Sequence, residues 1–427
     1  MKLKSIHLQN YRAHKDLTVK FDAPFTVVAG VNGSGKTSLL EGIAEVLPCF
    51  SVGAQYTETP SFPLDSFKGI NFVHLRTDET NGRFRFERQY PVQIAADSEL
   101  YGMEMEWEAV KYDGVTKAQY TNNIRGDIVQ ETMQPLFAFY RARRSWQADD
   151  QIINETRAAQ EKPSRLNGYE NWKNAETSVA SLQNWIIAKC LERYQWCSET
   201  GSLFNEITND ELALVNLALR QAVENIGGLR YDLYQKCMLV EWGSAAPVSF
   251  DNLSDGERVV ICLVADIARR ICLLNPQLGE RATVETPGVV LIDELDVHLH
   301  PKWQRLIVKG LKAAFPALQF IAASHSPQIL GELLPEEIVL LRPGGQDTRH
   351  PRVSYGLDSG QVLKAIMDAP ARNEDVEKKV EQLFTHIEAG ELDVAEAALG
   401  ELKRDAPQIP ELAGAEALIL RKKVLGR

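Results

Sequence analysis

Residues 25–37, FTVVAGVNGSGKT, constrain the fold of this chain more than any other stretch. An apolar run leads into a glycine-rich loop that fits G-x-x-x-x-G-K-[ST], and the amphipathic segment 36–47 follows the loop. Glycines at these positions let backbone N–H groups curl around phosphate oxygens, and the N-terminus of the next helix adds its positive end. The stretch therefore predicts a buried strand, a phosphate-binding loop and a helix, which together begin an α/β unit.

The loop also predicts a role for each polar side chain. Lys36 is expected to neutralise the β- and γ-phosphates of ATP, and Thr37 to offer its hydroxyl to Mg²⁺. The other candidate cofactor-binding residues of this segment are Gly30, Asn32, Gly33, Ser34, Gly35 and Ser38. The competing interpretation is a chance glycine-rich turn, and the flanking strand and helix count against it.

Two further apolar runs end in polar residues. PGVVLIDELDVHLHP, 287–301, ends its run at Asp293 and Glu294, and QFIAASHSP, 319–327, ends its run at His325. Asp293 is a candidate Mg²⁺ ligand, and Glu294 a candidate general base for the attacking water. A pair of helix-capping acids is the alternative, and the phosphate loop favours the metal site. Runs this uniformly apolar indicate a parallel sheet covered on both faces.

The stretch NLSDGERVV, 252–260, predicts another helix start. Ser254 can cap the helix and can also donate to a γ-phosphate oxygen, whereas Asp255 would repel phosphate and must point away. The plain interpretation is a capping box, because Ser254 and Glu257 lie three residues apart. Taken alone, the capping box is the better interpretation.

Composition limits the function classes. The 427-residue chain carries a net charge of −11, which argues against a surface that binds nucleic acid throughout. Arg141, Arg143 and Arg144 form a local basic stretch that is either a solvated loop or a phosphate contact. The scattered cysteines, and the lack of a signal peptide or of a membrane-length apolar segment, indicate a cytoplasmic protein that does not enter a membrane.

In their order, the phosphate loop, LSDGE, LIDELDVHLHP and ASHSP resemble the ABC-type ATPase head of the Rad50, SMC, RecF and OLD families. IHLQNYRAHKDLTVKF resembles the opening strands of those heads. The resemblance implies that the LSDGE helix faces ATP held by a second copy, so that two heads sandwich two nucleotides. It implies a fold class of α/β, an ABC-type P-loop head with an antiparallel β lobe, a helical insertion and a C-terminal helical hairpin.

Site residues carry over by position. Lys36, Thr37 and Ser38 resemble the Walker A set, and Asp293 and Glu294 the Walker B pair. The remaining correspondences are Ser254, Gly256 and Glu257 with the signature, Asp296 with the D-loop, His325 with the switch histidine and Arg12 with a nucleotide contact. Gln147 is the only glutamine near the expected Q-loop position and is not assigned. His298 and His300 are interpreted as structural or interfacial rather than as zinc ligands.

The compact chain, the strand PLFAFYRARRSW and the C-terminal GELDVAEAALGELK segment resemble, more closely, the ATPase subunit of Septu anti-phage systems, which also accompanies some retrons. That resemblance implies ATP-dependent dimers or larger homo-oligomers and a separate HNH nuclease subunit. The chain has no HNH pattern, and it ends too soon for a Toprim domain. The expected parts are an N-terminal ATPase lobe (1–149), a helical insertion (150–230), a C-terminal ATPase lobe (231–355) and a helical hairpin (356–427).

Other interpretations stay open. A RecF-like repair ATPase would clamp DNA directly, and contact with DNA or RNA is compatible with the basic stretch. A transporter ATPase is a third possibility, against which the β lobe and HLHP count. The C-terminal hairpin is equally compatible with a lid on its own head and with a dock for a partner.

Overall fold

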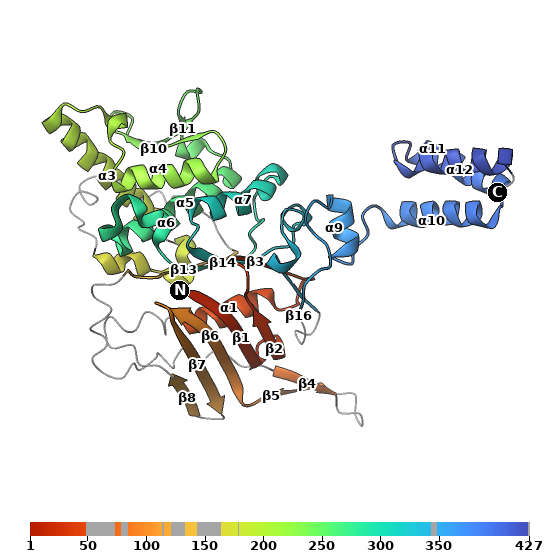
Figure 1. The fold of residues 1–427 in the computed structure, drawn as a ribbon, viewed down its shortest axis with the longest axis horizontal. Helices are drawn as coiled ribbons and strands as arrows, with labels where there is room; N and C mark the ends of the chain where they lie inside the picture. Colours follow the sequence, from red (N-terminus) through yellow and green to blue (C-terminus); the bar gives the residue numbers. More distant parts are fainter. Residues whose placement is uncertain are drawn as a thin grey trace. The chain divides into compact units, whose positions relative to one another are not determined.

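The computed structural model describes residues 1–47, 73–77, 84–112, 115–120, 133–142, 164–177, 179–342 and 348–425. Residues 1–356 form one compact unit whose scaffold is a six-stranded sheet in the order β16-β15-β3-β14-β13-β9. Figure 1 labels β13, β14, β3 and β16 of this sheet. The strands are β3 (Phe25–Ala29), β9 (Leu136–Tyr140), β13 (Gly288–Ile292), β14 (Leu318–Ala323), β15 (Ile338–Leu341) and β16 (Thr348–Arg349). All neighbours are parallel except β15 and β16.

Helices cover both faces of this sheet. Every residue of β3, β9, β13 and β14 is buried, which confirms the expected two-sided parallel sheet. In Figure 1, α1 (Lys36–Val46) lies on one side of the sheet, and α5 (Asp255–Leu274) and α7 (Pro301–Ala314) lie on the other. Because the strands are parallel, the residues that follow β3, β9, β13 and β14 meet at one edge, where ligands of open α/β sheets bind.

An antiparallel lobe packs on the α1 side. Its order is β2-β1-β6-β7-β8, formed by β1 (Lys2–Tyr11), β2 (His14–Lys20), β6 (Val92–Leu100), β7 (Met103–Tyr112) and β8 (Val115–Tyr120). One apolar core joins this lobe to α1 and to alternate residues of the central strands, such as Phe137, Phe139, Val289 and Leu291. Strands β4 (Val73–Thr77) and β5 (Phe84–Arg88) pair with each other in a separate antiparallel sheet.

The middle of the chain combines helices with a small sheet. It contains α3 (Val179–Thr200), α4 (Glu211–Ala222) and a sheet of β10 (Ile226–Asp232), β11 (Cys237–Trp242) and β12 (Val248–Ser249). The segment expected to be mostly helical thus ends in a strand, which begins after a left-handed turn at Asn225. Shorter elements are α6 (Ala282–Glu285), α8 (Pro327–Leu330) and the 3-10 helices Arg165–Tyr169, Trp172–Thr177, Phe204–Glu206, Phe250–Asn252, Pro276–Arg281 and Pro335–Glu337.

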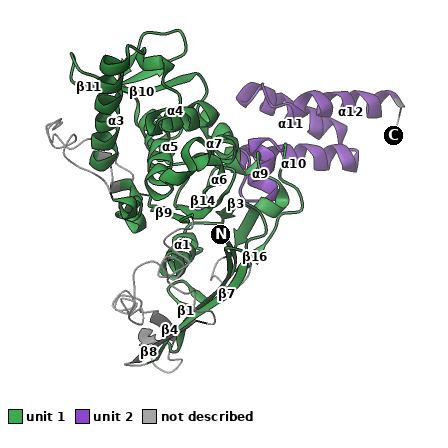
Figure 2. Cartoon of the chain, turned by 60° about the vertical axis from the view of Figure 1, so that its left-hand side comes forward, with its two compact units in different colours: residues 1–356 green, residues 357–427 purple. Residues whose placement is uncertain are grey.

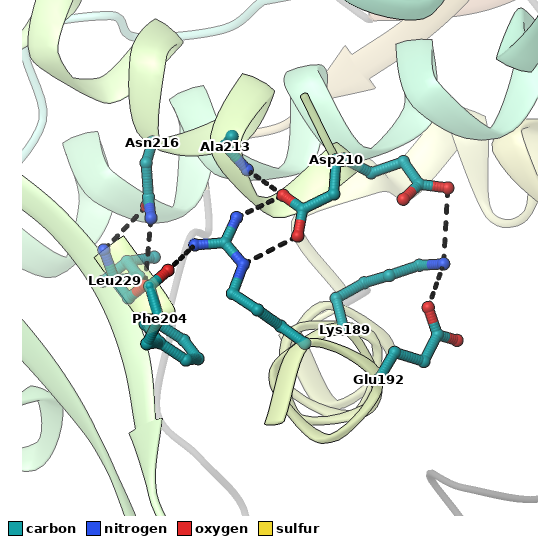
Figure 3. A network of polar contacts seen from close by, with 9 residues as sticks. Lys189, Glu192, Phe204, Asp210, Ala213, Asn216 and Leu229 are labelled. Carbon is teal, nitrogen blue, oxygen red and sulfur yellow. Dashed lines mark hydrogen bonds and ion pairs between the residues drawn. The ribbon is translucent and has the colours of Figure 1, made fainter. Parts of the chain in front are cut away.

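A polar network ties α3 to α4 (Figure 3). Arg193 of α3 is 6% exposed and pairs with Asp210, whose Oδ2 accepts its Nε–H at 2.7 Å. Asp210 Oδ1 also accepts the N–H of Ala213 at 2.8 Å, which caps α4. One carboxylate therefore neutralises a buried guanidinium and fixes the start of a helix.

A second charge cluster lies fully buried in α5. Asp266 Oδ1 accepts from Arg269 Nη2 at 2.6 Å, and its Oδ2 accepts from Arg270 Nε at 2.6 Å and from the Tyr140 hydroxyl at 2.8 Å. Arg270 Nη1 also donates to the Gly168 carbonyl at 3.0 Å. The cluster joins α5 to the end of β9 and to the 3-10 helix at 165–169.

Residues 357–427 form a second compact unit (Figure 2). It contains α9 (Ser359–Ala365), α10 (Glu374–Ala389), α11 (Leu392–Asp405) and α12 (Glu411–Leu425). The last three helices share an apolar core that includes Leu383, Leu399 and Ala415. A third helix therefore covers part of the apolar face that a two-helix hairpin would leave open. None of the helices in the described ranges is both long and apolar enough to cross a membrane.

Candidate nucleotide-binding site

The phosphate loop connects β3 to α1 and depends on glycine geometry. Gly33 and Gly35 have φ of 80° and 96°, in the left-handed region that favours glycine. A Cβ on Gly30 would lie 2.6 Å from the Leu341 carbonyl oxygen. The glycines are thus needed for two different reasons. Gly33 and Gly35 adopt a left-handed backbone conformation, and Gly30 lets the loop approach β15 closely.

Lys36 folds back over this loop. Its Nζ donates to the carbonyls of Gly30 at 3.0 Å and Val31 at 3.1 Å, and the residue is 7% exposed. Burial lowers the pKa of Lys36, while the carboxylates of Asp293, Glu294 and Asp296 oppose that shift. The ammonium group is thus held at the loop with three acids near it.

A hydroxyl and a carboxylate meet beside the loop. Thr37 Oγ1 lies 3.0 Å from Asp293 Oδ2 and 3.2 Å from Oδ1, although 256 residues separate the two. Asp293 is 4% exposed, and its N–H donates to the Tyr140 carbonyl of β9 at 2.8 Å. Oxygen ligands of this kind suit Mg²⁺, so the donor set fits the metal that the sequence predicts.

The loop itself also fits an anion. The Ser34 hydroxyl is buried and has no hydrogen-bond partner among the described residues. A buried unpaired donor is costly, and a phosphate oxygen is one group that could satisfy it. Together with the Lys36 ammonium, this hydroxyl gives the loop donors for a phosphate chain.

Glu294 and His325 complete the edge of the sheet. Glu294 has φ of 49°, a left-handed conformation uncommon for a residue with a side chain. Burial lowers the pKa of His325, and the nearby charge of Lys36 lowers it further against three opposing acids, Asp293, Glu294 and Asp296. Glu294, Asp293 and His325 therefore lie close to one another, at the ends of the neighbouring strands β13 and β14.

Asp296 is engaged within its own chain. Its Oδ1 accepts from the Ser324 hydroxyl at 2.6 Å and from the His325 N–H at 3.2 Å. The side chain that corresponds to the D-loop thus links the segment after β13 to the segment after β14. Its D-loop role stays a prediction.

The predicted capping box at the start of α5 is confirmed. Ser254 caps α5, its hydroxyl and its N–H both donate to Glu257 Oε2 at 2.8 Å, and the Glu257 N–H lies 3.4 Å from Ser254 Oγ. The Asp255 side chain is 74% exposed, and its Oδ1 lies 3.9 Å from Arg258 Nη1. Any γ-phosphate must compete with Glu257 for the Ser254 hydroxyl.

Gly256 meets its own chain rather than open space. A Cβ on Gly256 would lie 2.5 Å from the carbonyl oxygen of His298, a residue with φ of 63°. His300 caps α7 by accepting the Lys302 N–H at 3.3 Å. The HLHP segment thus has structural roles at the starts of α5 and α7.

Arg12 and Arg141 share one carboxylate. Both guanidinium groups pair with Glu41 of α1, with Arg141 Nη1 at 2.8 Å from Oε1. Glu41 is 9% exposed and needs such partners. Arg141 was weighed as a solvated loop residue or a phosphate contact, and in this structure it is an internal ion-pair partner. Gln147 and the other two arginines of the basic stretch, Arg143 and Arg144, lie outside the described residues.

Sequence reasoning missed His14. Its fully buried ring places Nε2 3.0 Å from the Gly35 carbonyl oxygen, beneath the phosphate loop. A Cβ on Gly35 would lie 2.5 Å from the ring. A lone histidine at a strand start carries no local signal for such a contact, because the loop lies 21 residues away in the sequence.

Comparisons with known proteins found one matching family and several relatives. The AAA domain family described as "putative AbiEii toxin, Type IV TA system" matches residues 25–331. The chain is 26% identical over 384 residues to the "Retron Vc95 probable ATPase" of Vibrio cholerae, an alignment that covers 80% of this chain and 73% of that protein. It is 28% identical over 386 residues to the "Septu protein PtuA" of Bacillus thuringiensis, with coverage of 87% and 85%.

Among solved structures, the "SMC head domain from Thermotoga maritima" aligns with a TM-score of 0.43 and 13% identity, over 83% of this chain and all of that one.

Proposed function

From the premise that this chain belongs to the AAA domain family described as "putative AbiEii toxin, Type IV TA system", we propose that it is an ATPase that binds and hydrolyses MgATP. The observation that carries the proposal is the convergence of Lys36, Thr37, Asp293, Glu294 and His325 at the carboxyl edge of the parallel sheet. This is the edge at which α/β sheets of this kind bind ligands.

Each side chain has a distinct role in the proposed reaction. Lys36 binds the phosphates, while Thr37 and Asp293 hold Mg²⁺, which supplies charge stabilisation when bound. Glu294 orients and deprotonates the attacking water, and a neutral His325 contacts the γ-phosphate as a hydrogen-bond donor. The lowered pKa of His325 supports the neutral form near pH 7.

We further propose that ATP pairs two copies of the chain. Ser254 and Asp255 are exposed at the N-terminus of a 20-residue helix, whose positive end suits an anion. In a paired state the Ser254 hydroxyl leaves Glu257 and donates to the γ-phosphate held by the other copy. Asp296 then lies at the contact between the two heads.

The biological role follows from the relatives. Their names, a retron ATPase and a Septu protein, support an ATPase of a cytoplasmic anti-phage defence complex. In this proposal the nucleotide state of the head pair gates a separate HNH nuclease subunit. The C-terminal unit, residues 357–427, is the proposed dock for that subunit.

Two substitutions test the ATPase and the pairing separately. Glu294→Gln keeps ATP binding but removes the base, so turnover falls by 10² or more and ATP-bound dimers accumulate. Ser254→Arg keeps ATP binding by the monomer but blocks pairing, measured as ATP-dependent mass in analytical ultracentrifugation. Ser198→Arg, at another exposed serine, on α3, is the matched control. Pairing that survives Ser254→Arg contradicts the two-copy arrangement.

The defence role is tested by co-expression with the neighbouring open reading frames. Co-purification of an HNH protein that is lost when residues 357–427 are deleted supports the dock. A chain that purifies alone and binds DNA or RNA with a steep salt dependence instead supports direct nucleic-acid clamping.

A further inference from the structure

Gln304 of α7 bridges the two segments that carry the reactive side chains. Its Nε2 donates to the Leu299 carbonyl at 2.9 Å and lies 3.4 Å from the Asp296 carbonyl. Its Oε1 accepts from the Ser326 hydroxyl at 2.6 Å. The first two contacts reach the segment after β13, which holds Glu294, and the third reaches the segment after β14, directly beside His325.

The chemistry of these contacts requires an amide. The position needs two N–H donors for two carbonyls and an acceptor for one hydroxyl, and the glutamine side chain supplies all three. A carboxylate would repel the carbonyls. A hydrocarbon would leave the Leu299 carbonyl without this donor and the Ser326 hydroxyl to donate to Gln328 Oε1, 3.0 Å away, instead of to the α7 side chain. Ser326 is itself fixed, because its Oγ accepts the N–H groups of Gln328 at 3.1 Å and Ile329 at 3.3 Å.

Asp296 provides a second link between the same segments. Its Oδ1 accepts from the Ser324 hydroxyl and the His325 N–H, so the backbone that leads into His325 is anchored to the segment after β13. The Asp296 contact fixes residues 324 and 325, and the Gln304 contact fixes residue 326. His325 therefore sits between two anchor points.

We propose that Gln304 is a positioning residue for ATP hydrolysis, which holds His325 in register with Glu294. This inference rests on the proposed ATPase function and adds to it a residue outside the loops that surround the nucleotide. Small displacements of reacting groups reduce rates strongly, by about 10²-fold for 1 Å, so an anchor of this kind affects turnover more than binding.

A purely structural role for Gln304, in the packing of α7, would depend on the apolar contacts of its side chain and not on its hydrogen bonds. The buried face of α7 is formed by Ile307, Val308 and Leu311, while Gln304 is half-buried at the edge. Gln304→Met keeps the length and most of the apolar contact of the side chain and removes only the hydrogen bonds. Lys309→Met, at an exposed position of the same helix, is the matched control.

The experiment uses the full-length chain and two measurements. In steady-state ATPase assays, Gln304→Met should lower kcat at least tenfold. The dissociation constant for ATP, measured by equilibrium binding, should stay within about twofold of wild type. Lys309→Met should change neither quantity. Ser326→Ala should give a similar loss of kcat. The double variant Gln304→Met/Ser326→Ala should be no worse than the more impaired single variant, because the two side chains act through one contact.

Hydrogen exchange of residues 324–329 in the nucleotide-free protein gives a readout independent of turnover. Exchange should be at least tenfold faster in Gln304→Met than in wild type or Lys309→Met. The inference would be overturned if wild type hydrolyses ATP and Gln304→Met has the same kcat. It would also be overturned if the losses of kcat add up in the double variant, or if hydrogen exchange of residues 324–329 is unchanged in Gln304→Met. If wild type does not hydrolyse ATP but Gln304→Met still accelerates hydrogen exchange, the proposed function is refuted. The structural link that Gln304 makes between the segments after β13 and β14 would stand.

Discussion

The buried cluster around Asp266 allows a quantitative prediction for Asp266→Asn. The substitution keeps the shape of the side chain but removes the charge that compensates Arg269 and Arg270, which are 3% and 0% exposed. Breaking a buried ion pair by removing one partner costs about 3–5 kcal/mol, because the remaining charge stays buried. The free energy of unfolding should fall by that amount.

The size of unit 1 converts this energy into a melting temperature. A unit of 356 residues has an unfolding entropy of about 0.7 kcal/mol/K, so Asp266→Asn should lower Tm by about 4–7 °C in scanning calorimetry. Glu285→Gln removes an exposed ion pair with Arg281 and should change Tm by less than about 1 °C. A shift for Asp266→Asn no larger than that of this control would refute the reasoning.

The pH dependence of the Tm difference between wild type and Asp266→Asn gives a second test. Burial alone would raise the pKa of Asp266, but Arg270 and Arg269 outweigh burial and lower it. The unfolded-state pKa of an aspartate is about 3.9, and the folded-state pKa of Asp266 lies below it. The stability that this carboxylate contributes is fully present at pH values above the unfolded-state pKa, and it is lost as pH falls through the folded-state pKa. The Tm difference between wild type and Asp266→Asn should therefore be constant from pH 5 to 8 and shrink only under more acidic conditions.

Two further predictions concern the site. Gly35→Ala should lower the Tm of the nucleotide-free protein more than Gly33→Ala. Both residues have positive φ, but only a Cβ on Gly35 would meet the buried His14 ring, at 2.5 Å. Equal Tm shifts in scanning fluorimetry would contradict this. Lys36→Met should raise the pKa of His325, because burial and the Lys36 charge both lower it and the substitution removes the charge; an unchanged or lower midpoint in an NMR histidine titration would contradict this.

The elements that sequence reasoning predicted well share strong local signals. The strands that end at Ala29, Ile292 and Ala323 are apolar runs bounded by glycine or by polar residues, and α1 follows directly from the loop chemistry. The start of α5 was predicted because Ser254 and Glu257 satisfy backbone groups within four residues of each other. Thr37 and Asp293 were paired across 256 residues only because a magnesium site needs both kinds of ligand.

Contacts without a local signal were not predicted. The pairing of Arg12 and Arg141 with Glu41 joins three elements whose sequences are ordinary when taken separately. Gln304 and His14 are single polar residues in a helix and at a strand start, and their partners are fixed only when the sheet brings distant segments together.

The close approach of Gly256 to the His298 carbonyl has a consequence for a pair of heads. In the proposed pair, the tip of α5 that reaches the nucleotide of the other copy also contacts the segment after Asp293 and Glu294 of its own copy. The two nucleotide sites would then be coupled through this contact, and the ATPase rate should rise sigmoidally with ATP concentration; a hyperbolic rise would contradict this coupling.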